Sequence, residues 1–198
     1  MTDSKPATSA TADSETAVSE SADSETADSE TADSETAVSG NNRLRLCVVL
    51  AAVIVALDQV TKHWALNALT GEPPQHVVWT LQWNLTFNSG MAFSKGRGMG
   101  PIIGVLALVV AGVVVATVRK QQQKTVAVAA GFVLGGAIGN VCDRIFRGAG
   151  WLRGSVVDFI DFQWFPIFNI ADIAVNVGGA IFVLWSLFSR APAETLAK

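Results

Sequence analysis

The acidic side chains that could do chemistry in this sequence are few, and they stand among long apolar runs. After Gly40 the chain contains only seven acids, namely Asp58, Glu72, Asp143, Asp158, Asp161, Asp172 and Glu194. An ionisable group just inside an apolar segment is costly and usually functional, and Asp172, at the start of such a run, is the clearest case. Carboxyl groups in these surroundings suit general acid–base chemistry.

Helical spacing sorts the polar residues into pairs. Residues three or four apart share one face of a helix, and three pairs have this spacing: Asp58–Lys62, Asn140–Arg144 and Asn169–Asp172. If each pair lies at the same side of a membrane, the three pairs form one polar layer. The plainer alternative is that helix ends are simply polar, and it is equally good for Lys62 and Arg147, because cations often reach out to interfaces.

Four apolar runs are long enough to carry these pairs. They cover about residues 44–66, 101–118, 126–142 and 170–188, and a bilayer crossing needs about 20 residues. Four such runs with little amphipathic alternation would be unusual as core helices of a water-soluble domain. We therefore predict an all-α polytopic membrane protein, with a four-helix domain over residues 41–190 and a cytoplasmic C-terminal tail over 191–198.

Glycine spacing predicts how two of these runs pack. Gly131, Gly135 and Gly139 recur every four residues in the third run, which gives one helix face without side chains. Such a face lets a neighbouring helix approach closely, and we expect the fourth run to pack there.

Basic residues predict the orientation in the membrane. Seven of them fall on one side of the four runs: Arg43, Arg45, Arg119, Lys120, Lys124, Arg190 and Lys198. The other side carries Lys95, Arg97, Arg147 and Arg153, with Lys62 and Arg144 near helix ends, so the bias holds once the residues of the candidate site are discounted. Because positive residues favour the cytoplasm, we place both termini there and the polar layer at the external face. The external segments are then residues 67–100 and 144–169. The stretch around residues 77–87 alternates β-branched and aromatic residues, as short strands do.

The first 40 residues differ in kind from the rest. They hold ten acids against one base, Lys5, for a net charge of −9, so the remainder of the chain carries +6 within the overall −3. The segment repeats Thr-Ala-Asp-Ser-Glu and has no aromatic residue, so it cannot bury a core and we expect a disordered tail. It also lacks the basic start of a secretory signal. Cys47 and Cys142 lack metal-ligand spacing, and we expect free thiols.

Five motif blocks together resemble those of the lipoprotein signal peptidases (signal peptidase II). They are Asp58-Gln59-Val60-Thr61-Lys62, Phe87-Asn88-Ser89-Gly90-Met91-Ala92-Phe93, the block from Gly135 to Arg144, Val156-Val157-Asp158-Phe159, and Phe168-Asn169-Ile170-Ala171-Asp172. Their order and spacing match the family over about residues 43–189. The acidic repeat tail lies outside that pattern, and Met91 stands where small residues are common.

The resemblance implies a membrane aspartic endopeptidase of the bacterial inner membrane. Asp158 and Asp172 would be the catalytic pair, surrounded by supporting residues: Asn88, Asn140, Arg144 and Asn169, with Asp58 and Lys62 as a structural or accessory pair. The β-like stretch would form an extracytoplasmic β-cradle, and the segment of Asp158 a short external helix. Neither a metal nor a cofactor is implied. The substrate would be a prolipoprotein with a diacylglyceryl-modified cysteine, reached from the membrane lipid. We expect a monomer that binds no nucleic acid.

Three alternatives remain open from the residues themselves. Intramembrane polar residues also line ion-coupled transporters and proton channels, but such paths need polar groups near the midplane. A non-enzymatic adaptor that binds partners through the tail would leave the five motif blocks unexplained. Within the peptidase hypothesis, Asp143 could replace Asp158 in the pair, although its place before Arg144 favours a structural ion pair.

Overall fold

The structure is a computed structural model that describes residues 14–90, 100–120, 123–148 and 150–189. The chain divides into two compact units, Met1–Asn41 and Asn42–Lys198. In the first unit, the described residues are helical from Ser14 onward, as the beginning of α1 (Ser14–Leu69). Residues 1–13 lie outside the described ranges, and the disorder of residues 1–40 stays a prediction. The second unit holds all the residues that the motifs single out.

Four helices in the described chain are long and apolar enough to cross a membrane, as predicted. They are the Asn41–Leu69 part of α1, α2 (Gly100–Lys120), α3 (Lys124–Phe146) and α4 (Ile170–Ser189). Each is slightly longer than the apolar run that predicted it. The extension of α3 to Phe146 matters most, because it takes Asp143 and Arg144 into the last turns of that helix.

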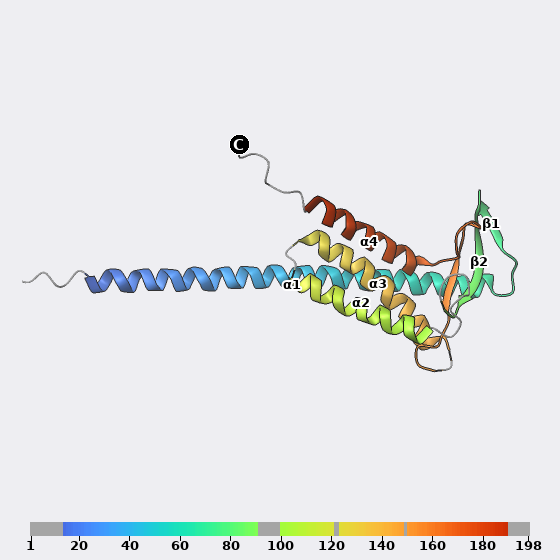
Figure 1. Ribbon diagram of the computed structural model, residues 1–198, viewed down its shortest axis with the longest axis horizontal. Coiled ribbons are helices and arrows are strands. Elements are labelled where there is room, and N and C mark those ends of the chain that lie inside the picture. Colours follow the sequence, from blue (N-terminus) through green and yellow to red (C-terminus); the bar gives the residue numbers. More distant parts are fainter. Residues whose placement is uncertain (1–13, 91–99, 121–122, 149, 190–198) are drawn as a thin grey trace, which may run out of the picture. The chain divides into compact units, whose positions relative to one another are not determined.

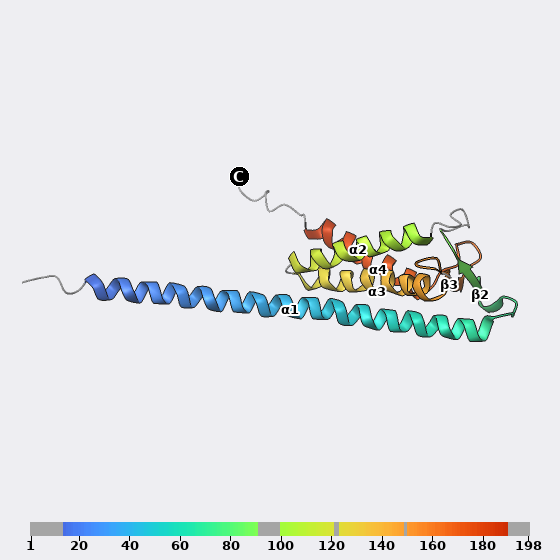
Figure 2. The same ribbon diagram turned by 90° about the horizontal axis from the view of Figure 1, so that it is seen from below.

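A small antiparallel sheet lies at one end of these helices (Figures 1 and 2). Its strands are β1 (Gln75–Val78), β2 (Leu81–Asn88) and β3 (Val156–Asp161), in the spatial order β1-β2-β3. The first two strands confirm the predicted β-like stretch. In the register of β2 and β3, Thr86 faces Asp158 and Asn88 faces Val156. The motif block that contains Asn88 therefore lies beside the block that contains Asp158.

The assignment of the Asp158 segment to a short external helix is wrong. Residues 156–161 form β3, and all six are buried. The sequence Val-Val-Asp-Phe-Ile-Asp is rich in β-branched and aromatic residues, which favour strands, and β2 offers it a partner edge. No short external helix occurs among the described residues, and residues 91–99, which include Met91, lie outside them.

Aromatic packing fixes the sheet to the end of α1. Buried Val157 and Phe159 of β3 share an apolar cluster with Ala65 and Leu69 of α1. The Trp64 ring lies 5.5 Å from that of Trp83 and 6.0 Å from that of Phe159, both edge to face. Such pairs add about 0.5–1.5 kcal/mol each beyond simple burial. β3 therefore has a fixed position relative to the helices.

The glycine face of α3 packs against two helices. A Cβ added at Gly131 or Gly135 would come within 2.8 Å of Leu50 or 2.7 Å of Ile54, both on α1. A Cβ at Gly136 would collide with the carbonyl oxygen of Ala171, and one at Gly178 of α4 would lie 2.7 Å from the carbonyl oxygen of Ala129. The fourth span does pack closely on the third, but mainly at Gly136; the face of Gly131 and Gly135, where we expected it, packs against α1 instead. Cys47 and Cys142 are free, as expected.

This packing predicts a stability difference between two glycine substitutions. Gly136→Ala should lower the free energy of unfolding by about 1–3 kcal/mol, because the new methyl group must push the α4 backbone away. Gly112→Ala on α2 is the matched control, since a Cβ there meets no atom within 4 Å. Thermal unfolding of both variants in detergent measures the difference. Equal melting temperatures for the two would contradict the close α3–α4 packing.

Candidate active site

Asp158 and Asp172 reach the same place from different elements. Asp158 lies in the middle of β3 and is 2 % exposed, and Asp172 lies in the first turn of α4. Asn169, just before α4, contacts both: its side-chain Nδ2 donates to Oδ1 of Asp158 at 2.6 Å, and its backbone N–H donates to Oδ2 of Asp172 at 3.2 Å. The two predicted catalytic carboxyls are therefore brought together around one asparagine.

The electrostatic surroundings of Asp158 favour its protonated form. Burial, followed by the negative charge of Asp172, raises the pKa of Asp158 from 3.8 to about 7. Hydrogen bonds from Asn169 and Asn88 favour the charged form and oppose this shift. A buried carboxyl beside a second carboxyl is the arrangement in which two acids share a proton, so this pair can offer an acid and a base at once near neutral pH.

Two further asparagines complete the hydrogen bonding of the pair. Asn88, at the end of β2, donates from Nδ2 to Oδ2 of Asp158 at 3.2 Å, and its own Oδ1 accepts the backbone N–H of Gly90 at 3.1 Å. Asn140 of α3 donates from Nδ2 to Oδ1 of Asp172 at 2.8 Å. Each carboxyl thus accepts hydrogen bonds on both of its oxygens, which fixes its orientation.

Lys62 lies behind Asn140 as the centre of a buried charge cluster. Its ammonium contacts Oδ2 of Asp58 and Oδ2 of Asp143, both at 2.8 Å, and all three side chains are 0 % exposed. Asp143 also accepts from Nε of Arg147 at 2.7 Å. The expectation of a structural ion pair for Asp143 agrees with these contacts, although the partners are Lys62 and Arg147 and not its neighbour Arg144.

Arg144 brings a buried guanidinium to the same region. The residue is 4 % exposed, and Nη2 donates to the carbonyl oxygen of Gly90 in a long contact of 3.4 Å. Nη1 is buried and has no hydrogen-bond partner within the described part of the chain. A guanidinium with an unused donor can bind a carbonyl or carboxylate oxygen. Of the predicted supporting residues, Arg144 is thus the one with a free donor for a bound molecule.

All eight predicted site residues fall in one region, but sequence reasoning missed some of their partners. Gln59 donates from Nε2 to Asp58, to the carbonyl of Gly139 and to Asp143, at 3.1–3.2 Å. The spacing of Asp143 and Arg147, four apart on one helix, was a readable signal for their ion pair. The backbone N–H of Val157 donates to Oδ2 of Asp143 at 3.1 Å, and no sequence pattern indicates this hydrogen bond.

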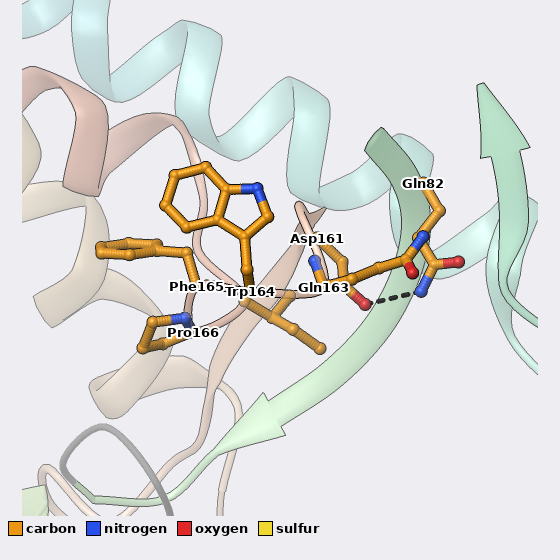
Figure 3. Close-up of a pocket in the computed structure, with 7 residues that line it drawn as sticks. Gln82, Asp161, Gln163, Trp164, Phe165 and Pro166 are labelled. Atoms are coloured by element: carbon orange, nitrogen blue, oxygen red, sulfur yellow. Dashed lines mark hydrogen bonds between the residues drawn. The ribbon is translucent and has the colours of Figure 1, made fainter. Parts of the chain in front are cut away.

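Asp161 is the last residue of β3, and it lies beside Gln82 of β2 and Gln163 of the turn that follows (Figure 3). It accepts from Nε2 of Gln82 at 2.7 Å, from Nδ2 of Asn84 at 2.9 Å and from the backbone of Gln163 at 2.6 Å. Burial alone would raise the pKa of Asp161, but these hydrogen bonds outweigh it and hold that pKa below its usual value. A pocket beside it is lined by Gln82, Asp161 and residues 163–167, and neither Asp158 nor Asp172 belongs to its lining.

Metal-binding potential in the described ranges is limited: these ranges contain no group of three or more His, Cys, Asp and Glu side chains that could hold a metal ion. Asp58 and Asp143, the two carboxylates that do approach one cation, share the ammonium of Lys62.

Comparisons with known proteins agree with this geometry. The family model for signal peptidase (SPase) II matches residues 50–188. Lipoprotein signal peptidases of Mycolicibacterium smegmatis and Mycobacterium avium are 45 % and 44 % identical over 150 residues, or 74 % of this chain. That of Rhodococcus jostii is 37 % identical over 159 residues, 78 % of this chain and 79 % of its own length. The matched region is 63 % of the M. smegmatis protein and 81 % of the M. avium protein.

Two solved structures, each described as a bacterial membrane enzyme, have the same fold. One aligns with a TM-score of 0.64 at 28 % identity and covers 77 % of this chain and 94 % of its own. The other aligns with a TM-score of 0.62 at 27 % identity and covers 73 % and 94 %. With four apolar helices and bacterial relatives, the protein is a multi-pass bacterial membrane protein. By its sequence match over residues 50–188, the chain belongs to the signal peptidase II family of proteases.

Proposed function

We propose that this chain is a lipoprotein signal peptidase of the aspartic type. It hydrolyses the peptide bond before the diacylglyceryl-modified cysteine of bacterial prolipoproteins and releases the signal peptide. The observation that carries the proposal is the pair of carboxyls, buried Asp158 and half-buried Asp172, joined through the buried side chain of Asn169. The names of the relatives support the substrate class, and the geometry supports the aspartic mechanism.

In the proposed reaction, the ionised member of the pair takes a proton from a water molecule. The water oxygen attacks the scissile carbonyl carbon while the protonated member donates its proton to the carbonyl oxygen. The tetrahedral intermediate then collapses, the carbon–nitrogen bond breaks, and a proton passes to the departing amine of the modified cysteine. Two coupled carboxyls suffice for both transfers, and the free donor of Arg144 can bind a substrate carbonyl.

The helices provide the surroundings for a lipid-modified substrate. One side of α2 carries large apolar side chains of which more than half of the surface is exposed, such as Ile102 at 63 %, Leu106 at 61 % and Val113 at 61 %. We take this side to face the lipid. Such faces accommodate acyl chains, so the substrate can enter sideways from the bilayer. The excess of basic residues at the opposite ends of the helices supports cytoplasmic termini and an active site near the extracytoplasmic face. We propose that the enzyme acts as a monomer.

A proton or ion pathway is the main competing function, and the distribution of polar residues disfavours it. Asn176 is the polar residue next along α4 after Asp172, and its side chain donates to the carbonyl of Asp172 at 2.8 Å, within its own helix. On α2 the segment from Gly100 to Ala116 has no ionisable residue. A continuous polar path would require such groups deeper in the bundle.

Replacing either member of the pair with asparagine should abolish cleavage. Asp158→Asn and Asp172→Asn keep the side-chain shape but remove the titratable group, so turnover should fall by at least about 10³-fold, in the range expected for general acid–base catalysis. Cleavage of a lipidated prolipoprotein by the purified variants in detergent, followed by mass, measures this.

The matched control is Asp161→Asn. The Asp161 carboxyl lies on the same strand, and it accepts from three donors that do not contact the catalytic pair. It should keep measurable turnover even where its melting temperature falls. Near-normal turnover of either catalytic variant, together with a folded but inactive Asp143→Asn, would transfer the catalytic role to Asp143.

The pH dependence of cleavage should report the proton on Asp158. Because burial and Asp172 raise the pKa of Asp158 to about 7, activity that needs the protonated acid should decline as the pH rises above that value. Asn88→Ala removes a hydrogen bond that favours the charged form, so the pKa of Asp158 should rise further. The basic limb of the kcat profile should then move to higher pH, by up to about one unit.

The two histidines supply the control for this profile. His63 and His76 are exposed, and histidine side chains are the usual source of a pH dependence between about pH 5 and 8. The double variant His63→Gln, His76→Gln should leave the basic limb in place. A limb that disappears in this variant, or that moves to lower pH in Asn88→Ala, would contradict Asp158 as the group that titrates.

A further inference from the structure

Lys62 contacts three oxygens and has no room for anything else. Its Nζ lies 2.8 Å from Asp58, 2.8 Å from Asp143 and 2.9 Å from Oδ1 of Asn140, and the side chain is 0 % exposed. An ammonium group has three donors and no acceptor. The atom of Asn140 that faces Lys62 must therefore be its oxygen.

This orientation decides what Asn140 presents to the catalytic pair. With its oxygen toward Lys62, its NH2 group points the other way and donates to Oδ1 of Asp172 at 2.8 Å. Nδ2 of Asn169 donates to the same Asn140 oxygen at 3.1 Å, and this second donor supports the same orientation. Turned over, Asn140 would set a carbonyl oxygen against a carboxylate, which is repulsive unless the carboxyl is protonated.

Asp172 also lies where a negative charge is favoured. Asn169 precedes α4 and its Oδ1 accepts the backbone N–H of Asp172 at 3.0 Å, while Oδ2 of Asp172 accepts the backbone N–H of Asn169 at 3.2 Å. This reciprocal pair of bonds is a capping box, and the start of a helix favours anions. Asp158 lies inside a strand, and the donors to its two carboxyl oxygens are the side chains of Asn169 and Asn88 and not the backbone of a helix end. The two carboxyls are therefore not equivalent.

On the basis of the function proposed above, we propose that Lys62 is a positioning residue for the catalytic pair. By donating to Oδ1 of Asn140, it turns the NH2 group of Asn140 toward Asp172, so that Asp172 stays ionised as the base and Asp158 keeps the proton as the acid.

The charges around Lys62 show why the effect runs through Asn140. Asp58 and Asp143 contact the ammonium directly, and Arg147 contacts Asp143, so two positive and two negative charges balance within this cluster. On the other side, the pair faces Arg144 from α3. The opposite charges of the cluster reduce its field on the pair, within which the Lys62 charge lowers the pKa of Asp158. The hydrogen bond to Asn140 is in addition a direct and directional contact.

A matched set of variants separates positioning from mere stabilisation. Asp58→Asn is the reference background. It removes one negative charge from the cluster, so that the later loss of the Lys62 charge leaves the cluster neutral, with Asp143 paired with Arg147. In that background, Lys62→Met removes the donor, and Lys62→Gln keeps an N–H donor without the charge. All three proteins are compared for melting temperature, kcat, KM and pH profile with lipidated prolipoprotein in detergent.

In the Asp58→Asn background, Lys62→Met should lower kcat by about tenfold or more, as expected for one hydrogen bond to a charged group, with little change in KM. The pH profile of kcat/KM should differ from that of the background, because the catalytic pair has lost an oriented hydrogen-bond donor. Lys62→Gln should recover most of the kcat and the pH profile, at a melting temperature similar to that of Lys62→Met.

Two results would overturn the proposal. One is a folded Lys62→Met protein with the kcat and pH profile of its background. The other is an equal loss of activity in Lys62→Met and Lys62→Gln that follows the melting temperature alone, since that pattern belongs to a structural residue. Failure of the catalytic pair itself is distinguished by turnover in Asp158→Asn or Asp172→Asn, which does not depend on Lys62.

Discussion

A lysine ammonium with no access to solvent is the constraint around which α1, α3, α4 and the strand β3 are arranged. Lys62 binds carboxylates from α1 and α3, and each carboxylate passes a second bond onward. Asp58 accepts the backbone N–H of Ala171 in α4 at 3.0 Å, and Asp143 accepts that of Val157 in β3 at 3.1 Å. Removing one partner of such a buried pair typically costs about 3–5 kcal/mol. The strand of Asp158 and the helix of Asp172 are therefore fixed by the same cation.

Small residues make this charge cluster possible. A Cβ at Gly139 would lie 2.6 Å from Oδ2 of Asp58, so any larger residue at this point of α3 would displace the carboxylate. The collision of a Cβ at Gly136 with Ala171 shows the same requirement toward α4. The buried ion pairs therefore require the close approach of the helices that the glycines allow. The catalytic layer forms where α1, α3 and α4 come closest.

Much of this arrangement could be predicted from sequence because the signals are local. Hydropathy gave the four spans, and i, i+4 spacing gave the face shared by Asp58 and Lys62. The strand that carries Asp158 was not recognised as such, because its partner β2 lies about 70 residues earlier in the chain and a run of six residues, four of them apolar, is too short for periodicity to separate a strand from a helix. The contact of Lys62 with Asp143 depends on the approach of α1 to α3 at Gly139. The glycine spacing predicts a close neighbour there but does not say which helix it is. The orientation of the Asn140 amide depends in turn on that contact.

The central claim is that Asp158 and Asp172 hold one proton between them near neutral pH. The most direct measurement is carbon-13 NMR of the protein labelled at aspartate carboxyl carbons, titrated in detergent, with Asp158→Asn and Asp172→Asn used to assign the two signals. We predict that the Asp158 signal titrates near pH 7 and moves toward lower pH in Asp172→Asn, because the neighbouring charge is gone. Signals that both titrate in the ordinary acidic range, without any mutual effect, would contradict a shared proton and with it the proposed mechanism.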